Sequence, residues 1–285
     1  MTGLATFLSR HDAIVRVALT SVRGSSPREA GTVMLAAARA QWGTIGGGQL
    51  EYLALDQARK MLRNGETTAT LDVPLGPDIG QCCGGRVEIA LATMDATARA
   101  TALAADAADR AAYPHVYLFG AGHVGRALAG LFAQLPVRCI LVDSRTEELV
   151  QCAAHIEKRL SALPEADIET APAGSAFIVL THDHALDFLL TSAALARQDA
   201  AYVGMIGSAT KRAKFTAWAK DNGPDDISNL ICPIGGPTGT DKRPAVIAAF
   251  VVAEVMAALT KAEVRETPAL ATSGPNGSTG TGGTT

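Results

Sequence analysis

The chain has 285 residues, 48% of them hydrophobic, which is enough to bury a sizeable core in one or two domains. Its formal net charge of −3 gives no general reason to expect binding to nucleic acid or to a membrane surface. The start of the chain has no apolar run typical of a signal peptide, and the most apolar helix candidate, 245–259, is too short to span a bilayer. Five cysteines, an odd number without regular spacing, fit a reducing compartment. We therefore expect a cytoplasmic protein.

The first part of the chain, residues 1–94, is predicted to be a smaller α+β domain. The segments 13–22 and 30–36 have strand character, and a helix is expected over 50–63. The alternating segments TATLDVPL and RVEIALAT are two further strands, joined by a loop that contains the sequence GQCCGG. Loops between strands commonly display ligand-binding groups.

Two glycine-rich blocks in this first domain can recognise an oxyanion. In GSSPR, small residues around an arginine suit a phosphate, and the GGG block leads directly into a helix whose first amides favour an anion. A sharp turn without a ligand explains three consecutive glycines equally well, so both interpretations stay open. The candidate binding residues are Ser25, Ser26, Arg28, Gly46, Gly47 and Gly48.

The two adjacent cysteines of GQCCGG are unsuited to a disulfide. Neighbouring Cα atoms are about 3.8 Å apart, whereas a disulfide usually joins Cα atoms about 4.4–6.8 Å apart. Chelation by both thiols is also awkward, because successive side chains of an extended segment point to opposite faces. We therefore expect one functional thiol, either Cys82 or Cys83, beside the open backbone of Gly84 and Gly85.

A change of composition separates the two halves of the chain. Residues 95–114, rich in Ala, Thr, Asp and Arg, are predicted to form a helical linker. Strands alternate with helices over 115–262, which is typical of a parallel sheet. Residues 263–285 are rich in Gly, Ser and Thr and are predicted to be disordered. The expected fold class is α/β, with a C-terminal Rossmann-like sheet preceded by the smaller α+β domain.

The segment LFGAGHVGR has the glycine spacing of a dinucleotide-binding loop between a strand and a helix. Asp143 ends the next strand, near the offset expected for an acid that binds a ribose. His123, at the helix start, has the chemistry to donate to a phosphate or to ligate a metal, although the spacing identifies no second ligand. NAD(P) is therefore a candidate ligand. The glycines of this loop are Gly120, Gly122 and Gly125.

The segment THDHALD follows another predicted strand and has the side chains for acid–base chemistry. His182 is expected at the carboxyl end of a sheet strand, where ligands collect in this fold. Asp183 fits a helix N-cap slightly better than a catalytic role, and exposed histidines are common in loops.

Taken together, these segments resemble the XdhC/CoxI family, the molybdenum-cofactor accessory proteins of xanthine dehydrogenase. The resemblance runs from about Val15 to Leu259 and departs from the family pattern at 235–244. The matching segments, in family order, are GSSPREAG, GTIGGGQLE, LGPDIGQCCGG, LFGAGHVGRALA, VDSR, THDHALD, YVGMIGSATKR and ICPIG.

The resemblance implies a role without catalysis. Proteins of this family bind molybdenum cofactor (molybdopterin), protect it while a cysteine desulfurase supplies its terminal sulfido ligand, and deliver it to xanthine dehydrogenase. They are usually homodimers. Cys83 matches the family cysteine before the glycine pair and would contact the molybdenum, whereas the role of Cys82 stays open. Arg28 and the glycine amides suit the phosphate or the pterin edge.

Two other functions compete with this one. The Rossmann-like half is compatible with an NAD(P)-dependent oxidoreductase that uses His182 or Asp183 as its acid or base. A thiol redox or metal sensor centred on Cys82 and Cys83 is the third and lesser hypothesis.

Overall fold

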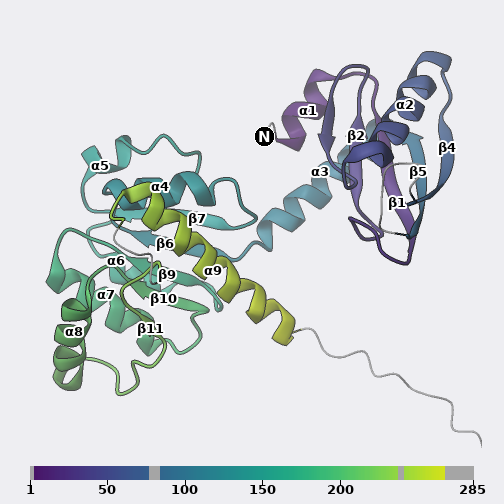
Figure 1. The fold of residues 1–285 in the computed structure, drawn as a ribbon. Helices are drawn as coiled ribbons and strands as arrows, with labels where there is room; N and C mark the ends of the chain where they lie inside the picture. Colours follow the sequence, from purple (N-terminus) through teal and green to yellow (C-terminus); the bar gives the residue numbers. More distant parts are fainter. Residues whose placement is uncertain (1–2, 77–83, 237–240, 267–285) are drawn as a thin grey trace, which may run out of the picture. The chain divides into compact units, whose positions relative to one another are not determined.

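The computed structural model describes residues 3–76, 84–236 and 241–266, with side chains as far as residue 261. The backbone divides into two compact units, Met1–Ala112 and Tyr113–Thr285 (Figure 1). The predicted linker, 95–114, contains a helix that groups with the first unit. Of the predicted tail, residues 263–266 belong to the last helix, and the rest lies outside the described residues.

The first unit is built on a five-stranded antiparallel sheet in the order β3-β2-β1-β5-β4. Helix α2 packs on one face of this sheet, while α1 and the first half of α3 contribute to a second apolar cluster. The guanidinium of Arg99, in α3, donates a hydrogen bond to the carbonyl of Leu8, 2.9 Å away. The elements are α1 (Leu4–Arg10), β1 (Val15–Arg23), β2 (Val33–Ala36), β3 (Gln41–Gly43), α2 (Gly48–Asn64), β4 (Thr68–Pro74), β5 (Arg86–Thr93) and α3 (Ala96–Ala111).

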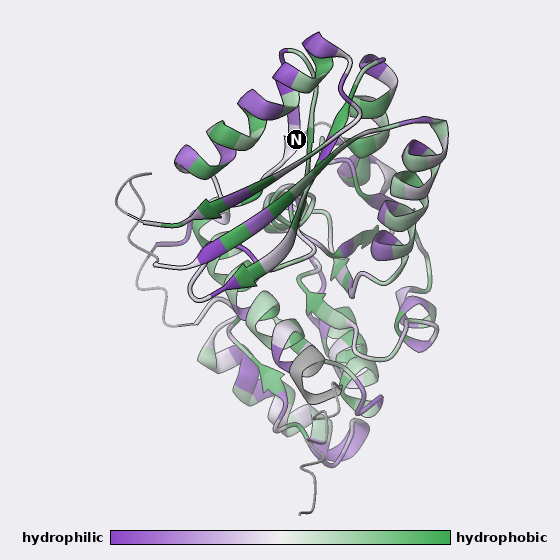
Figure 2. Ribbon diagram, turned by 90° about the vertical axis from the view of Figure 1, so that its right-hand side faces the viewer, coloured by the Kyte–Doolittle hydropathy of each residue, from purple (hydrophilic) through white to green (hydrophobic). Residues whose placement is uncertain are grey.

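Helix α2 shows why the sequence folds in this way locally. Leu50, Ala54, Ala58 and Met61 recur every three or four residues, and all four are buried. The helix ends at Gly65, which has a left-handed backbone (φ 73°) and donates its N–H to the carbonyl of Met61. Several helices show this alternation of hydrophilic and hydrophobic residues along the ribbon (Figure 2).

The second unit contains a six-stranded parallel sheet in the order β11-β10-β9-β6-β7-β8. The chain runs outward from β6 to β7 and β8, then returns to place β9, β10 and β11 on the other side. Ligands of such sheets bind outside the carboxyl ends of the strands where the order reverses, here between β6 and β9. The strands are β6 (His115–Phe119), β7 (Arg138–Asp143), β8 (Glu157–Leu160), β9 (Ala176–Val179), β10 (Tyr202–Met205) and β11 (Leu230–Ile231).

Helices cover both faces of the parallel sheet. Residues of α4, α5 and α9 join the apolar cluster on one face, and residues of α6, α7 and α8 join the cluster on the other. The predicted fold class, a Rossmann-like parallel sheet preceded by a smaller α+β domain, is therefore confirmed. The helices are α4 (His123–Phe132), α5 (Thr146–Val150), α6 (Pro164–Glu169), α7 (His184–Ala196), α8 (Ala209–Asn222) and α9 (Pro244–Glu266).

Helix α9 is longer than the apolar segment 245–259 considered from the sequence. By length and composition alone, Pro244–Lys261 is apolar enough to cross a membrane, and it is the one such helix within the described residues. Part of this apolar character serves the core of the second unit. Val251 and Val255 are completely buried in the same cluster as α4.

Three of the five cysteines lie in the described part of the chain, and all three are free and buried. Burial raises the pKa of the Cys139 thiol to about 12, which leaves it protonated at neutral pH. Cys139 and Cys152 are packing residues, because both belong to an apolar core cluster. Cys232 is buried in the cluster on the other face.

Candidate functional sites

Three glycine-rich segments of the first unit meet at one place. Ser25 forms a parallel β-bridge with Gly84, so the GSSPR block lies beside the glycine pair that follows the cysteines. A Cβ on Gly85 would come within 2.1 Å of the Ser25 carbonyl oxygen, and one on Gly24 within 3.2 Å of the Gly85 Cα. Only glycines permit this approach of the two backbones.

The third segment is the GGG block. A Cβ on Gly46 would stand 2.9 Å from the Cβ of Pro27, the residue before Arg28. Gly46, Gly47 and Gly48 have φ values of 125°, 75° and 62°, which favour glycine over residues with a side chain. The structure therefore brings together blocks that are well separated in the sequence.

The cysteine loop starts and ends on this cluster. Leu75 donates its N–H to the Gly85 carbonyl at 2.7 Å and accepts one from Gly84 at 2.8 Å, which closes the base of the loop. Leu75 is fully buried, so this base is anchored in the core. Cys82 and Cys83 lie outside the described residues, although the chain passes directly from Cys83 to Gly84.

The loop before α2 is held by a carboxylate of the helix itself. Oε2 of Glu51 accepts hydrogen bonds from the Ile45 and Gly47 amides, each at 3.2 Å, and from the Thr44 hydroxyl at 2.5 Å. Gln41 donates to its other oxygen at 2.7 Å. Burial raises the pKa of Glu51, but these hydrogen bonds outweigh burial and hold the pKa below its usual value. Glu51 therefore remains ionised at neutral pH.

The polar side chains of the GSSPR block are more available to a ligand than the amides that donate to Glu51. Ser25 and Arg28 are exposed, and Ser26 accepts only a long hydrogen bond, 3.5 Å, from the Arg28 amide. Within the described residues Arg28 makes no ion pair with an acidic side chain. This guanidinium is therefore free to meet an anionic ligand.

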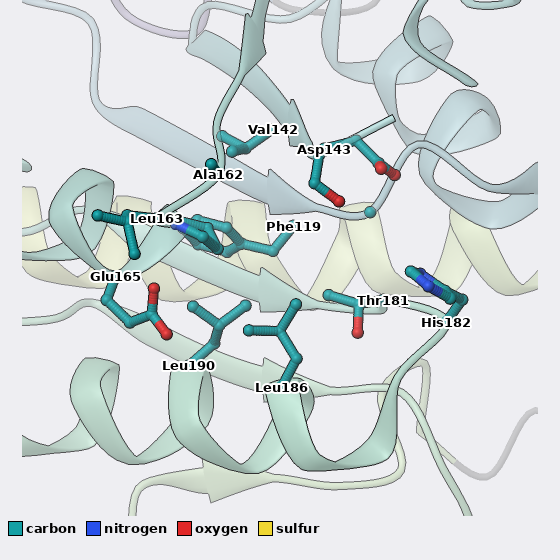
Figure 3. Close-up of a pocket in the computed structure, with 13 residues that line it drawn as sticks. Phe119, Val142, Asp143, Ala162, Leu163, Glu165, Thr181, His182, Leu186 and Leu190 are labelled. Carbon is teal, nitrogen blue, oxygen red and sulfur yellow. The ribbon is translucent and has the colours of Figure 1, made fainter. Parts of the chain in front are cut away.

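The second candidate site is a cavity of about 150 Å³ at the carboxyl ends of the parallel strands. It lies at the reversal of strand order between β6 and β9, the position that the fold favours for a ligand. Asp143 and His182 lie at one end of the cavity, and Leu163 and Glu165 at the other (Figure 3). Its apolar wall is formed by Phe119, Val142, Leu163, Leu186 and Leu190.

The three glycines of the segment LFGAGHVGR differ in how closely other atoms of the protein approach them. A Cβ on Gly120 would come within 2.4 Å of the Leu180 carbonyl oxygen, and one on Gly125 within 1.9 Å of the Gly120 carbonyl oxygen. Gly122, by contrast, has an ordinary φ of −63°, and a Cβ there would meet nothing within 4 Å. His123, the first residue of α4, is exposed.

Asp143 lines the cavity, and each oxygen of its carboxylate accepts two hydrogen bonds from the protein. Oδ2 accepts a hydrogen bond from the Ala121 amide at 2.7 Å and one from the Arg145 guanidinium at 3.0 Å. Oδ1 accepts from the Arg145 amide and from its Nε, each at 3.0 Å. Burial raises the pKa of Asp143, but the Arg145 side chain and the two amides outweigh burial and hold the pKa below its usual value.

The THDHALD segment divides into exposed and buried residues. His182 is exposed and lines the cavity, as a ligand-binding role requires. Asp183 is the N-cap of α7 and accepts hydrogen bonds from the amides of Ala185 and Leu186. This geometry supports the capping interpretation of Asp183.

Sequence reasoning missed a buried ion pair beside the cavity. The carboxylate of Asp187 is completely buried, pairs with the ammonium of Lys211, and accepts hydrogen bonds from the amide and hydroxyl of Thr181 at 2.9 and 2.7 Å. The pair joins α7 to the start of α8, and the hydrogen bonds to Asp187 hold Thr181, a residue that lines the cavity, in the loop after β9. Asp187 and Lys211 occur in separate motifs, and no spacing rule connects them.

Arg145 was also missed, although it follows the predicted ribose acid by two residues in VDSR.

Neither unit contains a group of three or more His, Cys, Asp or Glu side chains suited to a metal among the described residues. The cofactor contacts predicted for Cys83 and for the glycines stay predictions.

The fold and the two sites define a two-part protein with a glycine-rich first unit and a Rossmann-type second unit. A family model described as "XdhC and CoxI family" matches residues 7–74, and one described as "XdhC Rossmann domain" matches residues 116–255. The chain belongs to the XdhC/CoxI family, as the resemblance predicted.

The chain is also similar to an uncharacterized protein of Escherichia coli strain K12, YqeB. The two are 26% identical over 258 residues, which cover 82% of this chain and 41% of the relative. The chain thus spans about two fifths of that relative's length. A crystal structure from Bacillus halodurans, described as a xanthine dehydrogenase, matches with a TM-score of 0.75 and 18% identity, over 93% of this chain and 97% of that one. This similarity shows the fold.

Proposed function

We propose that this protein is a cytoplasmic accessory protein, without catalytic activity of its own, that binds molybdenum cofactor. In this role it protects the cofactor while a cysteine desulfurase supplies the sulfido ligand, and it delivers the cofactor to xanthine dehydrogenase. Family membership supports the general role of a maturation factor. A homodimer is part of the same proposal.

The observation that carries this proposal is the convergence in the first unit. The backbone after Cys83 is held against Gly24 and Ser25, and the GGG block lies against Pro27. A soft thiolate is a suitable contact for a molybdenum centre, and the chain passes from Cys83 directly into this cluster. The proposed cofactor surface is therefore made of glycine backbone with one or two thiols at its edge.

The free groups of the cluster fit the chemistry of the cofactor. Its phosphate needs a cation or free donors, and Arg28 has no acidic partner among the described residues. The Ile45 and Gly47 amides already donate to Glu51, so they are poor candidates for the phosphate. We therefore assign the phosphate contact to Arg28 and the neighbouring serines.

The proposal is tested by purifying the full chain from a host that makes molybdenum cofactor and oxidising it with acid and iodine. We expect a fluorescent pterin to be released from the wild type and much less from Cys83→Ala. Cys152→Ala, which alters a buried packing thiol of the second unit, is the matched control and should release the wild-type amount. Wild-type protein without any pterin, or a Cys83→Ala protein with normal cofactor that activates xanthine dehydrogenase, would contradict the assignment.

A second candidate function, nucleotide binding, is favoured by the cavity of the second unit. The cavity lies at the strand-order reversal and is lined by Gly120. Gly122, two residues further along the same loop, has no steric reason to be glycine, which is expected where a ligand approaches the backbone. We expect NADH fluorescence to change saturably on addition of the protein and Gly122→Asp to abolish the change. Nucleotide binding is compatible with the accessory role, whereas an oxidoreductase would also need turnover that depends on His182.

A further inference from the structure

The ribose position of the second unit is filled by a side chain of the protein. A carboxylate offers about four lone-pair positions, and the four hydrogen bonds to Asp143 use all of them. A ribose could not donate its hydroxyls to this carboxylate in the present arrangement. A ligand with a free ribose must therefore displace one of the existing donors.

The donors to Asp143 fall into two groups. The amides of Ala121 and Arg145 belong to the backbone and hold the carboxylate in place. The other two donors, Nε and Nη2 of Arg145, form a fork with one hydrogen bond to each oxygen. The two vicinal hydroxyls of a ribose can donate the same two hydrogen bonds in place of the Arg145 side chain, while the two backbone amides continue to donate to Asp143.

Arg145 has a second acceptor within reach. Its Nη1 lies 4.0 Å from Oε1 of Glu148, whose other oxygen accepts a hydrogen bond from Arg126 at 2.5 Å. The Arg145 side chain is 29% exposed, so it is not enclosed by packing. A movement toward Glu148 would give the guanidinium another carboxylate partner, while Asp143 would keep its two backbone amide donors and accept hydrogen bonds from the ribose.

We infer that Arg145 takes the hydrogen-bonding positions of the cavity-lining Asp143 that a ribose would use, and that a nucleotide with free 2′ and 3′ hydroxyls displaces it toward Glu148. The inference rests on the nucleotide-binding proposal above and adds the ligand class and the residue that sets specificity. A 2′-phosphorylated nucleotide is disfavoured, because its phosphate offers no pair of hydroxyl donors and would face the Asp143 carboxylate once Arg145 has moved. The cavity thus selects NADH over NADPH.

The test is a fluorescence titration of the full-length wild type and of Arg145→Ala with NADH and with NADPH. We expect Arg145→Ala to bind NADH about threefold to tenfold more tightly, because the competing fork is gone. Simple electrostatics predicts the opposite sign, since removing a cation should weaken the binding of any anionic nucleotide. NADPH should show no gain in affinity.

The matched background is Asp143→Asn, which removes the negative charge and one of the two acceptor oxygens for which Arg145 and the ribose compete. In that background Arg145→Ala should no longer tighten NADH binding, and the double-mutant cycle should show coupling between the two residues. ADP and 2′-deoxy-ADP test the diol directly: the gain in Arg145→Ala should be smaller for the deoxy ligand.

The outcomes separate this inference from the proposals on which it rests. If both proteins bind NADH equally well, or if Arg145→Ala weakens NADH and NADPH alike, the displacement of Arg145 is wrong and nucleotide binding stands. Tighter wild-type binding of NADPH than of NADH also overturns it, because Arg145 would then contact the 2′-phosphate. If neither protein binds either nucleotide, the nucleotide proposal fails as well, while the pterin assay still decides the molybdenum-cofactor role.

Discussion

Two helices of this protein, α2 and α4, begin directly after glycine-rich loops, and the amides of these two loops are used differently. At α2 the carboxylate of Glu51 accepts hydrogen bonds from Ile45 and Gly47, so the loop that precedes the helix is tied to the helix itself. At α4 the N-cap is Gly122, with no side-chain cap and no acidic residue in the first turn. The loop before α2 is tied to its own helix by Glu51, whereas α4 has no acidic residue in its first turn.

The difference teaches that glycines alone do not identify an anion site. A helix start attracts any carboxylate within reach, including one in its own first turn. In α2 that carboxylate is three residues after the first helical residue, Gly48, and it takes the Gly47 amide, one of the donors that the GGG block offered to an anion. In α4 the nearest such carboxylate, Asp143, comes from the next strand and takes only the Ala121 amide.

The largest effect is expected from Gly125→Ala, which tests whether the α4 start is held rigidly. The new Cβ would lie 1.9 Å from the Gly120 carbonyl oxygen, so backbone must move. We expect a loss of about 3 kcal/mol or more in the free energy of unfolding of the second unit, measured by calorimetry. Gly130→Ala, in the same helix and with nothing within 4 Å, is the matched control and should be neutral or stabilising. A Gly125→Ala protein as stable as wild type would show that helix and strand do not pack this closely.

A smaller effect is expected from Glu51→Gln, which weakens the internal cap of α2. The free energy of unfolding of the first unit should fall by about 1 kcal/mol at pH 7, measured by urea titration. The folded-state pKa of Glu51 is lowered, so its stabilisation is present above the unfolded pKa and is lost as pH falls through the folded pKa. The difference between wild type and variant should therefore shrink in acid.

Asp56→Asn is the control for this experiment, because Asp56 is an exposed acidic residue of the same helix. It should change stability little at either pH. If Glu51→Gln and Asp56→Asn behave alike at pH 7, the carboxylate of Glu51 does not hold the loop, and the contrast between α2 and α4 loses its basis.

Much of the fold around these two helices could be predicted from the sequence, because it depends on periodicity and glycine spacing. The alternation of strands and helices after residue 115 predicted the parallel sheet, and GAGHVG predicted the loop before α4. The short strand β3 was missed, since Gln41–Gly43 is too brief to show alternation. It exists because Trp42 and Gly43 pair with Leu35 and Met34 of β2.

The use of each polar side chain could not be predicted in the same way. Periodicity places Glu51 and Asp143 at a helix start and a strand end, but it does not say whether each accepts from water, a ligand or a neighbouring donor. That choice depends on Arg145 turning back onto Asp143, and on the Ile45 and Gly47 amides facing Glu51. The Asp187–Lys211 pair depends likewise on tertiary packing of separate elements.

The smallest effect on stability, and the sharpest test of the open helix start, belongs to Gly122→Ala. The backbone there is ordinary and the added methyl meets no protein atom within 4 Å, so the free energy of unfolding should change by less than about 1 kcal/mol. A ligand that approaches this backbone would meet the methyl, and NADH binding should weaken about tenfold or more. Gly130→Ala should leave NADH binding unchanged. Because stability is conserved, a loss of affinity can be assigned to the approach of the ligand, and unchanged affinity would mean that the glycine at 122 does not serve a nucleotide.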